Sequence, residues 1–246
     1  RLREFGILAI PGGFTYGDDV SAGRILANEM RSLMEDQVRE FIGSGKLALG
    51  ICNGFQMLVK AGLLPGPRPR TPAPPPSPPA PNFGGEAGGE QSFAPVDGLP
   101  EQSVTLAENL NGRFQCRWVR LRVREGAAPP FLAGMDGQVL EVPIAHGEGR
   151  FCASPETLER IEAGGQVALQ YCGPDGRLDD RHNVNGSALH AAGISGYDGR
   201  VLGLMPHPER YVHGTQHPRW TREGLRTEGQ GLAIFRNAVQ WASRAG

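Results

Sequence analysis

The chain has 246 residues, and its 25 basic and 26 acidic side chains leave a formal net charge of −1. A charge so nearly balanced gives no long-range attraction to nucleic acid or to an anionic membrane surface, so we expect neither as a partner. No apolar run reaches the roughly 20 residues that a membrane-spanning helix needs. The length suits one α/β domain or two small ones.

The cysteines give an indication of the compartment. There are four, Cys52, Cys116, Cys152 and Cys172, and no two of them form a C-x-x-C pair. They are too few and too widely spaced for a disulfide framework. Reduced thiols are the rule inside the cell, so the sequence favours a cytoplasmic protein.

The first third of the chain alternates between apolar runs and an amphipathic pattern. Residues 6–10 and 47–51 are short and apolar, which is typical of buried parallel strands. Residues 22–44 and 53–61 space their apolar side chains as helices packed on a sheet do, with glycines at the ends. This order predicts a sheet of parallel strands with helices on its faces.

A proline-rich segment follows. Residues 65–81 contain 10 prolines in 17 positions, and a glycine-rich stretch comes next. Prolines donate no backbone hydrogen bond, and the segment has few apolar side chains to bury. We therefore predict a single domain over residues 1–246, interrupted by a disordered insertion at about 65–95. The alternative is a polyproline ligand for a partner domain.

The second half of the chain predicts further strands and helices. Ser154 precedes Pro155, which is the pattern of a helix N-cap followed by proline in the first turn. A strand followed by a glycine-rich turn is expected within residues 138–151. The other expected elements are strands at 103–109, 117–123, 166–172 and before residue 206, and helices at 154–165 and 229–244.

A cysteine lies at a turn that suits a nucleophile. The apolar strand at 47–51 leads into Gly50-Ile51-Cys52-Asn53-Gly54, and a helix follows. Glycines permit a sharp strand-to-helix turn that exposes the central side chain, as in the G-x-nucleophile-x-G elbow. The helix N-terminus favours the thiolate, and the amide of Asn53 is placed to donate to an oxyanion. The alternative is a buried structural cysteine between two packing glycines.

A histidine and a glutamate lie two residues apart after another apolar strand. In the segment 202–210, His207 and Glu209 flank a proline. A cysteine nucleophile needs a base, and the base needs a carboxylate to orient it. Side chains two positions apart in an extended turn point to the same side, so Glu209 is expected to orient His207. An exposed His-Glu pair in a loop is the alternative.

Four segments together resemble the class I glutamine amidotransferase domains. They are PGGFTYGDD (11–19), LGICNGFQ (49–56), PIAHGEGRF (143–151) and LGLMPHPER (202–210). NGRFQCRW (111–118) and NVNGS (183–187) fit one branch of that family. The resemblance implies an α/β fold: an open, mostly parallel, flavodoxin-like sheet with helices on both faces. Members normally begin with one further strand and helix, so we expect those two elements to be missing here.

The same resemblance implies the roles of individual residues. Cys52 matches the nucleophile, His207 the base and Glu209 its orienting partner. The amides of Gly13 and Asn53 match the oxyanion donors. Two further residues have open alternatives. Gln56 matches a contact to the substrate glutamine or is an ordinary helix residue, and His146 lines the site, forms the turn or faces a partner.

The implied activity is hydrolysis of glutamine to glutamate, with ammonia passed to a separate synthetase subunit. The sequence contains no GxxxxGK[ST] phosphate loop. We therefore expect ATP and magnesium on that synthetase, with no cofactor and no metal site in this chain; a small third subunit is a further candidate partner. Three alternatives stay open: a glutaminase for another synthetase, a cysteine hydrolase or chaperone of similar fold, and a truncated, non-catalytic interaction module.

Overall fold

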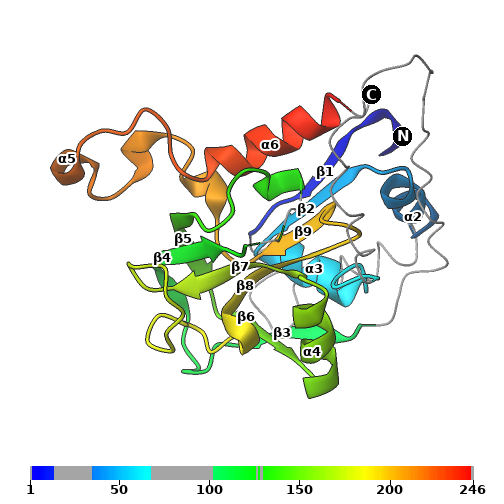
Figure 1. Ribbon diagram of the computed structural model, residues 1–246, viewed down its shortest axis with the longest axis horizontal. Helices are drawn as coiled ribbons and strands as arrows, with labels where there is room; N and C mark the ends of the chain where they lie inside the picture. Colours follow the sequence, from blue (N-terminus) through cyan, green and yellow to red (C-terminus); the bar gives the residue numbers. More distant parts are fainter. Residues whose placement is uncertain (1, 14–34, 68–101, 126, 128–129, 245–246) are drawn as a thin grey trace, which may run out of the picture.

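The computed structural model describes residues 2–13, 35–67, 102–125, 127 and 130–244. Its centre is a seven-stranded sheet with the order β1-β2-β9-β8-β7-β4-β5 (Figure 1). The strands are β1 (Ile7–Ile10), β2 (Leu47–Ile51), β4 (Gln115–Val123), β5 (Val139–His146), β7 (Val167–Cys172), β8 (Ala191–Gly196) and β9 (Val201–Leu204).

The α/β class is confirmed, but the expectation of a mostly parallel sheet is wrong for neighbouring strands. Strand β2 pairs in parallel with β1 and with β9, whereas the four remaining pairs are antiparallel. Five strands nevertheless run in one direction, because β8 and β4 alone are reversed among those described. Antiparallel neighbours need no helical crossover, and β8 and β9 are joined by the short segment 197–200.

Helices cover both faces of the sheet, as the sequence predicts. Helices α2 (Glu35–Gly43) and α3 (Asn53–Lys60) pack into one apolar cluster, and α6 (Leu232–Ala242) packs into the other. Figure 1 shows α6 on the opposite side of β1 and β2 from α3. Strand β2 is buried along its whole length because both of its faces are covered.

A small second sheet packs beside α3. Strand β3 (Val104–Glu108) pairs antiparallel with β6 (Glu148–Ala153), and α4 (Pro155–Ala163) follows. The sequence predicts a glycine-rich turn and no strand at β6, and that is wrong. Only Gly147 separates β5 from β6, so the turn is far shorter than expected. Ser154 caps α4 as predicted, since its side chain accepts a hydrogen bond from the amide of Thr157.

Several shorter elements connect these strands. Helix α5 (Trp220–Glu223) lies in the part of the chain that extends from the body of the molecule in Figure 1. The 3-10 helices are η1 (Leu2–Glu4), η2 (Pro130–Leu132), η3 (Ala188–His190), η4 (Pro208–Arg210) and η5 (Gly214–Gln216). None of the described helices is long and apolar enough to cross a membrane.

Two predicted segments extend beyond the described residues. Helix α2 coincides with the last part of the helix predicted at 22–44, and residues 22–34 lie outside the described ranges. Most of the insertion predicted at about 65–95 also lies outside, because residues 68–101 are not described, but its first residue belongs to the packed structure. Pro65 is buried and its carbonyl accepts a 2.6 Å hydrogen bond from Nε2 of Gln166. Strand β1 is the last strand at its edge of the described sheet, and the expected lack of a further strand and helix stays a prediction.

Candidate active site

Cys52 occupies the turn between β2 and α3 in a strained conformation. Its backbone has φ 52° and ψ −107°, and it is the residue that precedes the first turn of α3. A positive φ in a non-glycine residue costs on the order of 1–3 kcal/mol and is common in functional turns. The predicted elbow is therefore present, with Cys52 at its tip.

The two glycines of this elbow are required by close backbone contacts. A Cβ on Gly54 would lie 2.1 Å from the carbonyl oxygen of Ile10, in the neighbouring strand β1. A Cβ on Gly50 would lie 2.6 Å from the carbonyl oxygen of Gly54. Any larger residue would push α3 away from the sheet, and the sulfur of Cys52 would move with it.

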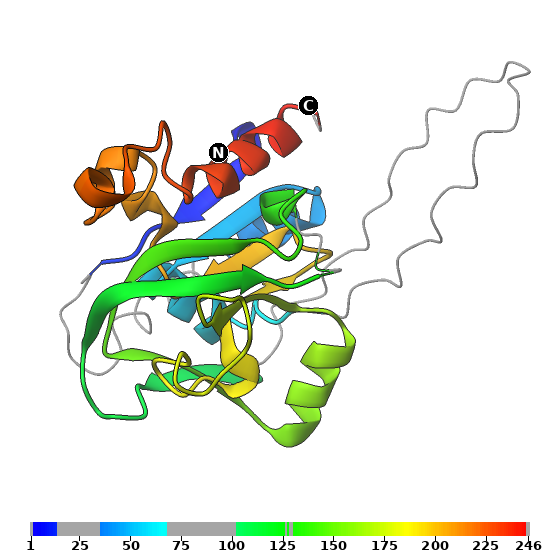
Figure 2. The ribbon, with the colours of Figure 1, turned by 60° about the vertical axis from the view of Figure 1, so that its left-hand side comes forward.

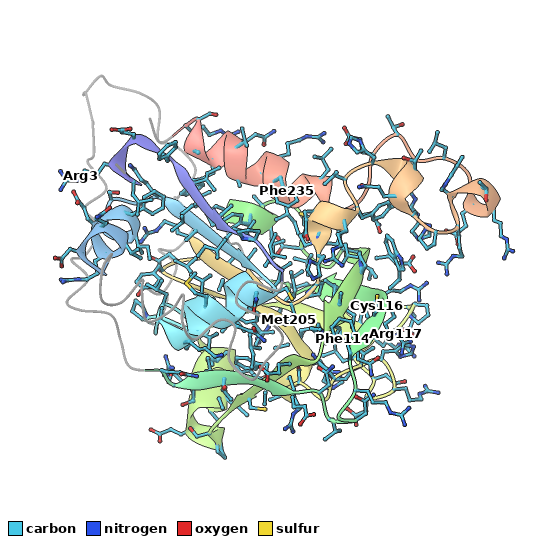
Figure 3. The ribbon with its side chains drawn as sticks, turned by 180° about the vertical axis from the view of Figure 1, so that it is seen from behind. Arg3, Phe114, Cys116, Arg117, Met205 and Phe235 are labelled. Atoms are coloured by element: carbon cyan, nitrogen blue, oxygen red, sulfur yellow. The ribbon has the colours of Figure 1, made fainter. Side chains whose placement is uncertain are left out.

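His207 and Glu209 form the expected pair at the end of β9. Met205, which Figure 3 places in the middle of the molecule, is 1% exposed and precedes the turn. The Glu209 carboxylate lies 2.6 Å from Nδ1 of His207. A carboxylate can only accept, so Nδ1 donates and Nε2 is left for acid–base chemistry. The turn is a 3-10 helix from Pro208, not the predicted extended segment, because its carbonyl bonds back to the amide of Tyr211.

Gly12 brings the nucleophile and the base together. A Cβ on Gly12 would lie 2.8 Å from Cε1 of His207 and 3.0 Å from Cβ of Cys52. The two side chains therefore approach the same point, from the ends of two adjacent strands. Only a residue without a side chain leaves that space open.

Strand β5 closes the site from the opposite edge of the sheet. Sγ of Cys52 lies 3.8 Å from the carbonyl oxygen of Ala145, and the amide of His207 donates a 2.8 Å hydrogen bond to the carbonyl of Pro143. Figure 2 shows β4 and β5, in green, bending around the sheet. Because β2, β9 and β5 run in one direction, their carboxyl ends lie at the same end of the sheet, where open α/β sheets bind ligands.

Burial decides the protonation of Cys52. It raises the pKa of the thiol to about 11, although the amide of Asn53 and the charge of Arg210 both lower it; the charge of Glu209 adds to the increase. The predicted effect of the helix N-terminus is thus present but smaller than the cost of burying a thiolate. Cys52 is a thiol at neutral pH, so it needs a base when it attacks.

The two proposed oxyanion donors lie side by side. The side-chain Nδ2 of Asn53 donates to the carbonyl of Gly13, which fixes the backbone of residue 13 next to the elbow. Gly13 has φ 141°, a conformation that favours glycine. The backbone amide of Asn53 faces the sulfur of Cys52. Residue 13 therefore lies next to the elbow, and the roles of the Gly13 and Asn53 amides as oxyanion donors stay a prediction.

Gln56 also lies at the site, but its amide is engaged by the protein. Its backbone amide bonds to the carbonyl of Cys52 at 3.1 Å, and its side-chain Nε2 donates to the carbonyl of Glu148 at 2.7 Å. The side chain is 8% exposed. In this arrangement Gln56 ties α3 to the start of β6, and its contact to a substrate stays a prediction.

His146 ends β5 and is buried beside the same turn. Its ring is 4% exposed, and a Cβ on Gly149 would lie 2.4 Å from it. Burial and then the charge of His207 lower the pKa of His146 to about 4, so the ring is neutral at physiological pH. Of the three roles left open for His146, a partner-facing one does not fit a buried ring.

Three residues of the site could not be identified from motifs. They are Gly12, which leaves room for the nucleophile and the base to approach each other, Ala145, whose carbonyl faces the sulfur, and Arg210, whose charge lowers the pKa of Cys52. All three lie inside segments that the family resemblance selects, but their roles depend on distances between strands. Within the described ranges, no group of three or more His, Cys, Asp or Glu side chains is placed to hold a metal ion.

Comparisons with known proteins identify the family of this chain. Residues 1–242 match the family of CobB/CobQ-like glutamine amidotransferase domains. The phosphoribosylformylglycinamidine synthase subunit PurQ of Dehalococcoides mccartyi is 44% identical over 98% of this chain and 82% of its own length. The PurQ subunit of Methanococcus maripaludis strain C7 is 33% identical over 99% of this chain and 83% of its own length.

A solved structure is also similar. The PurLQS structure from Thermotoga maritima contains a chain that is 28% identical, with a TM-score of 0.62 over 96% of this chain and 80% of that one. The family match, the sequence relatives and the solved structure agree with one another. The chain therefore belongs to the CobB/CobQ-like glutamine amidotransferases and, among them, to the PurQ family.

Proposed function

We propose that this chain is the glutaminase component of phosphoribosylformylglycinamidine synthase, with Cys52 as its nucleophile. It hydrolyses glutamine to glutamate and supplies ammonia to a separate synthetase subunit in de novo purine biosynthesis. That synthetase uses ATP to aminate formylglycinamide ribonucleotide, and ATP and magnesium bind there. The observation that carries the proposal is the joint approach of Cys52 and the Glu209-bound His207 to Gly12.

The reaction follows from the positions of these groups. Nε2 of His207 removes the proton of the Cys52 thiol as the sulfur attacks the side-chain amide carbon of glutamine. The amides of Gly13 and Asn53 donate to the oxyanion, an effect typically worth about 3 kcal/mol per donor. His207 then protonates the departing nitrogen, ammonia leaves, and water releases glutamate from the sulfur.

Glu209 keeps His207 ready for both proton transfers. Its carboxylate holds the proton on Nδ1 and stabilises the imidazolium that forms after the first transfer. The high pKa of the Cys52 thiol makes this base necessary, because a free thiolate is rare at neutral pH. A thiol nucleophile also requires a reducing environment, which supports a cytoplasmic location.

The partner is the synthetase subunit of the same complex. A PurQ-like chain is part of the solved PurLQS assembly, which supports this partner and a small third subunit. We infer that residues 1–246 form one domain, because both apolar clusters draw on strands from the two halves of the chain. A glutaminase for another synthetase is less well supported, because the full-length relatives are PurQ subunits.

The test compares two nitrogen sources in the reconstituted complex. Cys52→Ser is expected to abolish glutamine-dependent synthesis and leave ammonia-dependent synthesis unchanged, because only glutamine hydrolysis needs the thiol. The matched control is Cys116→Ser, at an exposed cysteine of β4, which should retain both activities. Equal loss of both activities in Cys52→Ser, or loss of neither, would contradict the proposal.

A further inference from the structure

His146 presents a hydrogen-bonding atom that nothing in the proposed mechanism uses. It is the last residue of β5, whose carboxyl end meets those of β2 and β9 at the site. The carbonyl of the preceding residue, Ala145, lies 3.8 Å from Sγ of Cys52. The carbonyl of Glu148, two residues after His146, accepts a hydrogen bond from the side chain of Gln56. The backbone on both sides of His146 therefore contacts the site.

Asn109 fixes which nitrogen of His146 carries the proton. Nδ2 of Asn109 donates to the carbonyls of Arg113, at 2.8 Å, and of His146, at 2.9 Å. Both amide hydrogens are used, so the atom that faces the ring is the acceptor Oδ1, 3.1 Å from Nδ1 of His146. Nδ1 must donate to it, which leaves an unshared electron pair on Nε2.

This Nε2 is buried and has no hydrogen-bond partner within the described residues. An unsatisfied buried acceptor destabilises the folded chain, so such an atom requires an explanation. The ring cannot escape the cost by protonation, because its pKa is lowered to about 4 by burial and by the charge of His207. Nε2 of His207 is buried and unpartnered in the same way. In the proposed mechanism, the partner of Nε2 of His207 is the group with which it exchanges a proton.

We propose that Nε2 of His146 accepts a hydrogen bond from the carboxamide nitrogen of bound glutamine and so orients the leaving group. The inference rests on the proposed glutaminase function. The carboxamide carbon must come within bonding distance of Sγ of Cys52, so its nitrogen comes close to the turn that follows Ala145. His146 holds one N–H of that nitrogen. Once the sulfur has added to the carboxamide carbon, the lone pair becomes localised on the nitrogen and is turned toward His207.

The bonds in this step balance without a further reactant. The C–N bond breaks while the C–S bond to Cys52 is kept, and the proton on Nε2 of His207 moves to the leaving nitrogen. His146 accepts a hydrogen bond before and after the step and exchanges no proton. It contributes by orientation, which matters because a misplaced leaving group is protonated more slowly.

Loss of His146 should affect two substrates differently when they differ only in the leaving group. The γ-methyl ester of glutamate has the same carbon chain as glutamine but no N–H on its leaving oxygen. His146→Phe removes the acceptor and keeps a planar ring. We expect it to lower kcat for glutamine about tenfold to a hundredfold, the value of one hydrogen bond, and to change kcat for the ester by less than about threefold.

The assay measures glutamate release by the complex of this chain with its synthetase. His146→Met fills the same space with a flexible side chain and replaces His146→Phe if that variant does not fold. His146→Gln restores an acceptor and should recover part of the amide rate. His217→Phe is the matched control, because His217 is 6% exposed and packs against Trp118 instead of the site.

Three results would overturn the inference. They are equal losses on both substrates, no loss on either, and a rise in KM for both substrates with kcat unchanged, which would place His146 at the α-amino end of glutamine. Failure of the underlying function looks different, since wild-type protein would then hydrolyse neither substrate and Cys52→Ser would change nothing.

Discussion

The Glu209 carboxylate lies 2.6 Å from Nδ1 of His207, although His207 is 1% exposed and Glu209 is 40% exposed. The orienting carboxylate is thus at the surface while the base is inside. Arg210 flanks the same carboxylate at 3.7 Å. Glu209 can therefore be substituted, and its hydrogen bond to His207 removed, without loss of core packing.

Glu209→Gln should lower glutamine turnover by roughly a hundredfold or more while the protein stays folded. A neutral amide stabilises the imidazolium less and can hold the wrong tautomer. The measurement is kcat for glutamate release beside the melting temperature. Glu228→Gln is the control, because it also neutralises a carboxylate, here one that forms a 2.6 Å ion pair with Arg236 away from the site. Wild-type turnover in a folded Glu209→Gln variant would rule out the orienting role.

Alkylation of Cys52 should be slow near neutral pH in the protein without glutamine. The pKa of its thiol is raised to about 11, so at pH 8 its thiolate fraction is roughly a hundredfold below that of an ordinary cysteine. Iodoacetamide labelling followed site by site with mass spectrometry measures this, with the exposed Cys116 as the internal reference. Equal labelling rates for the two cysteines at pH 8 would contradict the protonated state described above.

Gly12→Ala should remove most glutaminase activity with a smaller effect on stability. The added methyl group would lie 2.8 Å from His207 and 3.0 Å from Cys52, so it would force apart the two groups that exchange a proton. Gly43→Ala is the control, since a Cβ there meets no atom within 4 Å. We expect kcat to fall by at least about tenfold in Gly12→Ala, which corresponds to about 1.4 kcal/mol. Unchanged turnover would show that the gap is not needed.

His146 should make the protein sensitive to mild acid. Its pKa is about 4 in the folded chain and 6.5 when the side chain is exposed to water in an unfolded chain, so between these values the unfolded chain binds a proton that the folded chain does not. Stability is therefore lost as pH falls from 6.5 towards 4, by up to roughly 3 kcal/mol from this group. Urea unfolding at about pH 7 and about pH 4.5 measures the loss, which should be smaller in His146→Gln. Identical losses in both proteins would contradict this assignment.

Local sequence patterns predicted the elements that carry the reactive side chains. Strand β2, the elbow at Cys52 and helix α3 were all predicted, because an apolar run, two glycines and an amphipathic pattern each act over a few residues. The N-cap at Ser154 is equally local. The pairing of His207 with Glu209 was predicted from their two-residue spacing together with the cysteine elbow at Cys52.

The parts that the sequence did not reveal depend on contacts between distant segments. Strand β8 has the sequence AAGISG, whose small residues have low strand propensity, and it is a strand because β7 and β9 pair with it on both sides. Strand β6 was missed because its partner β3 lies some 40 residues earlier in the chain. The contact between Ala145 and Cys52 likewise requires the sheet to curl.

That curl places the chemistry where the outermost strand β5 meets the ends of the inner strands β2 and β9. The hydrogen bond from His207 to Pro143 joins the end of β9 to β5, the outermost strand on the other side. Among the described residues, few backbone hydrogen bonds join β5 to these strand ends, so this contact should open at lower free energy than the strands on either side of it. Glutamine hydrolysis then requires this contact to be formed. Low concentrations of urea should therefore abolish glutamine hydrolysis while the amide protons of β2 and β7 remain protected from exchange.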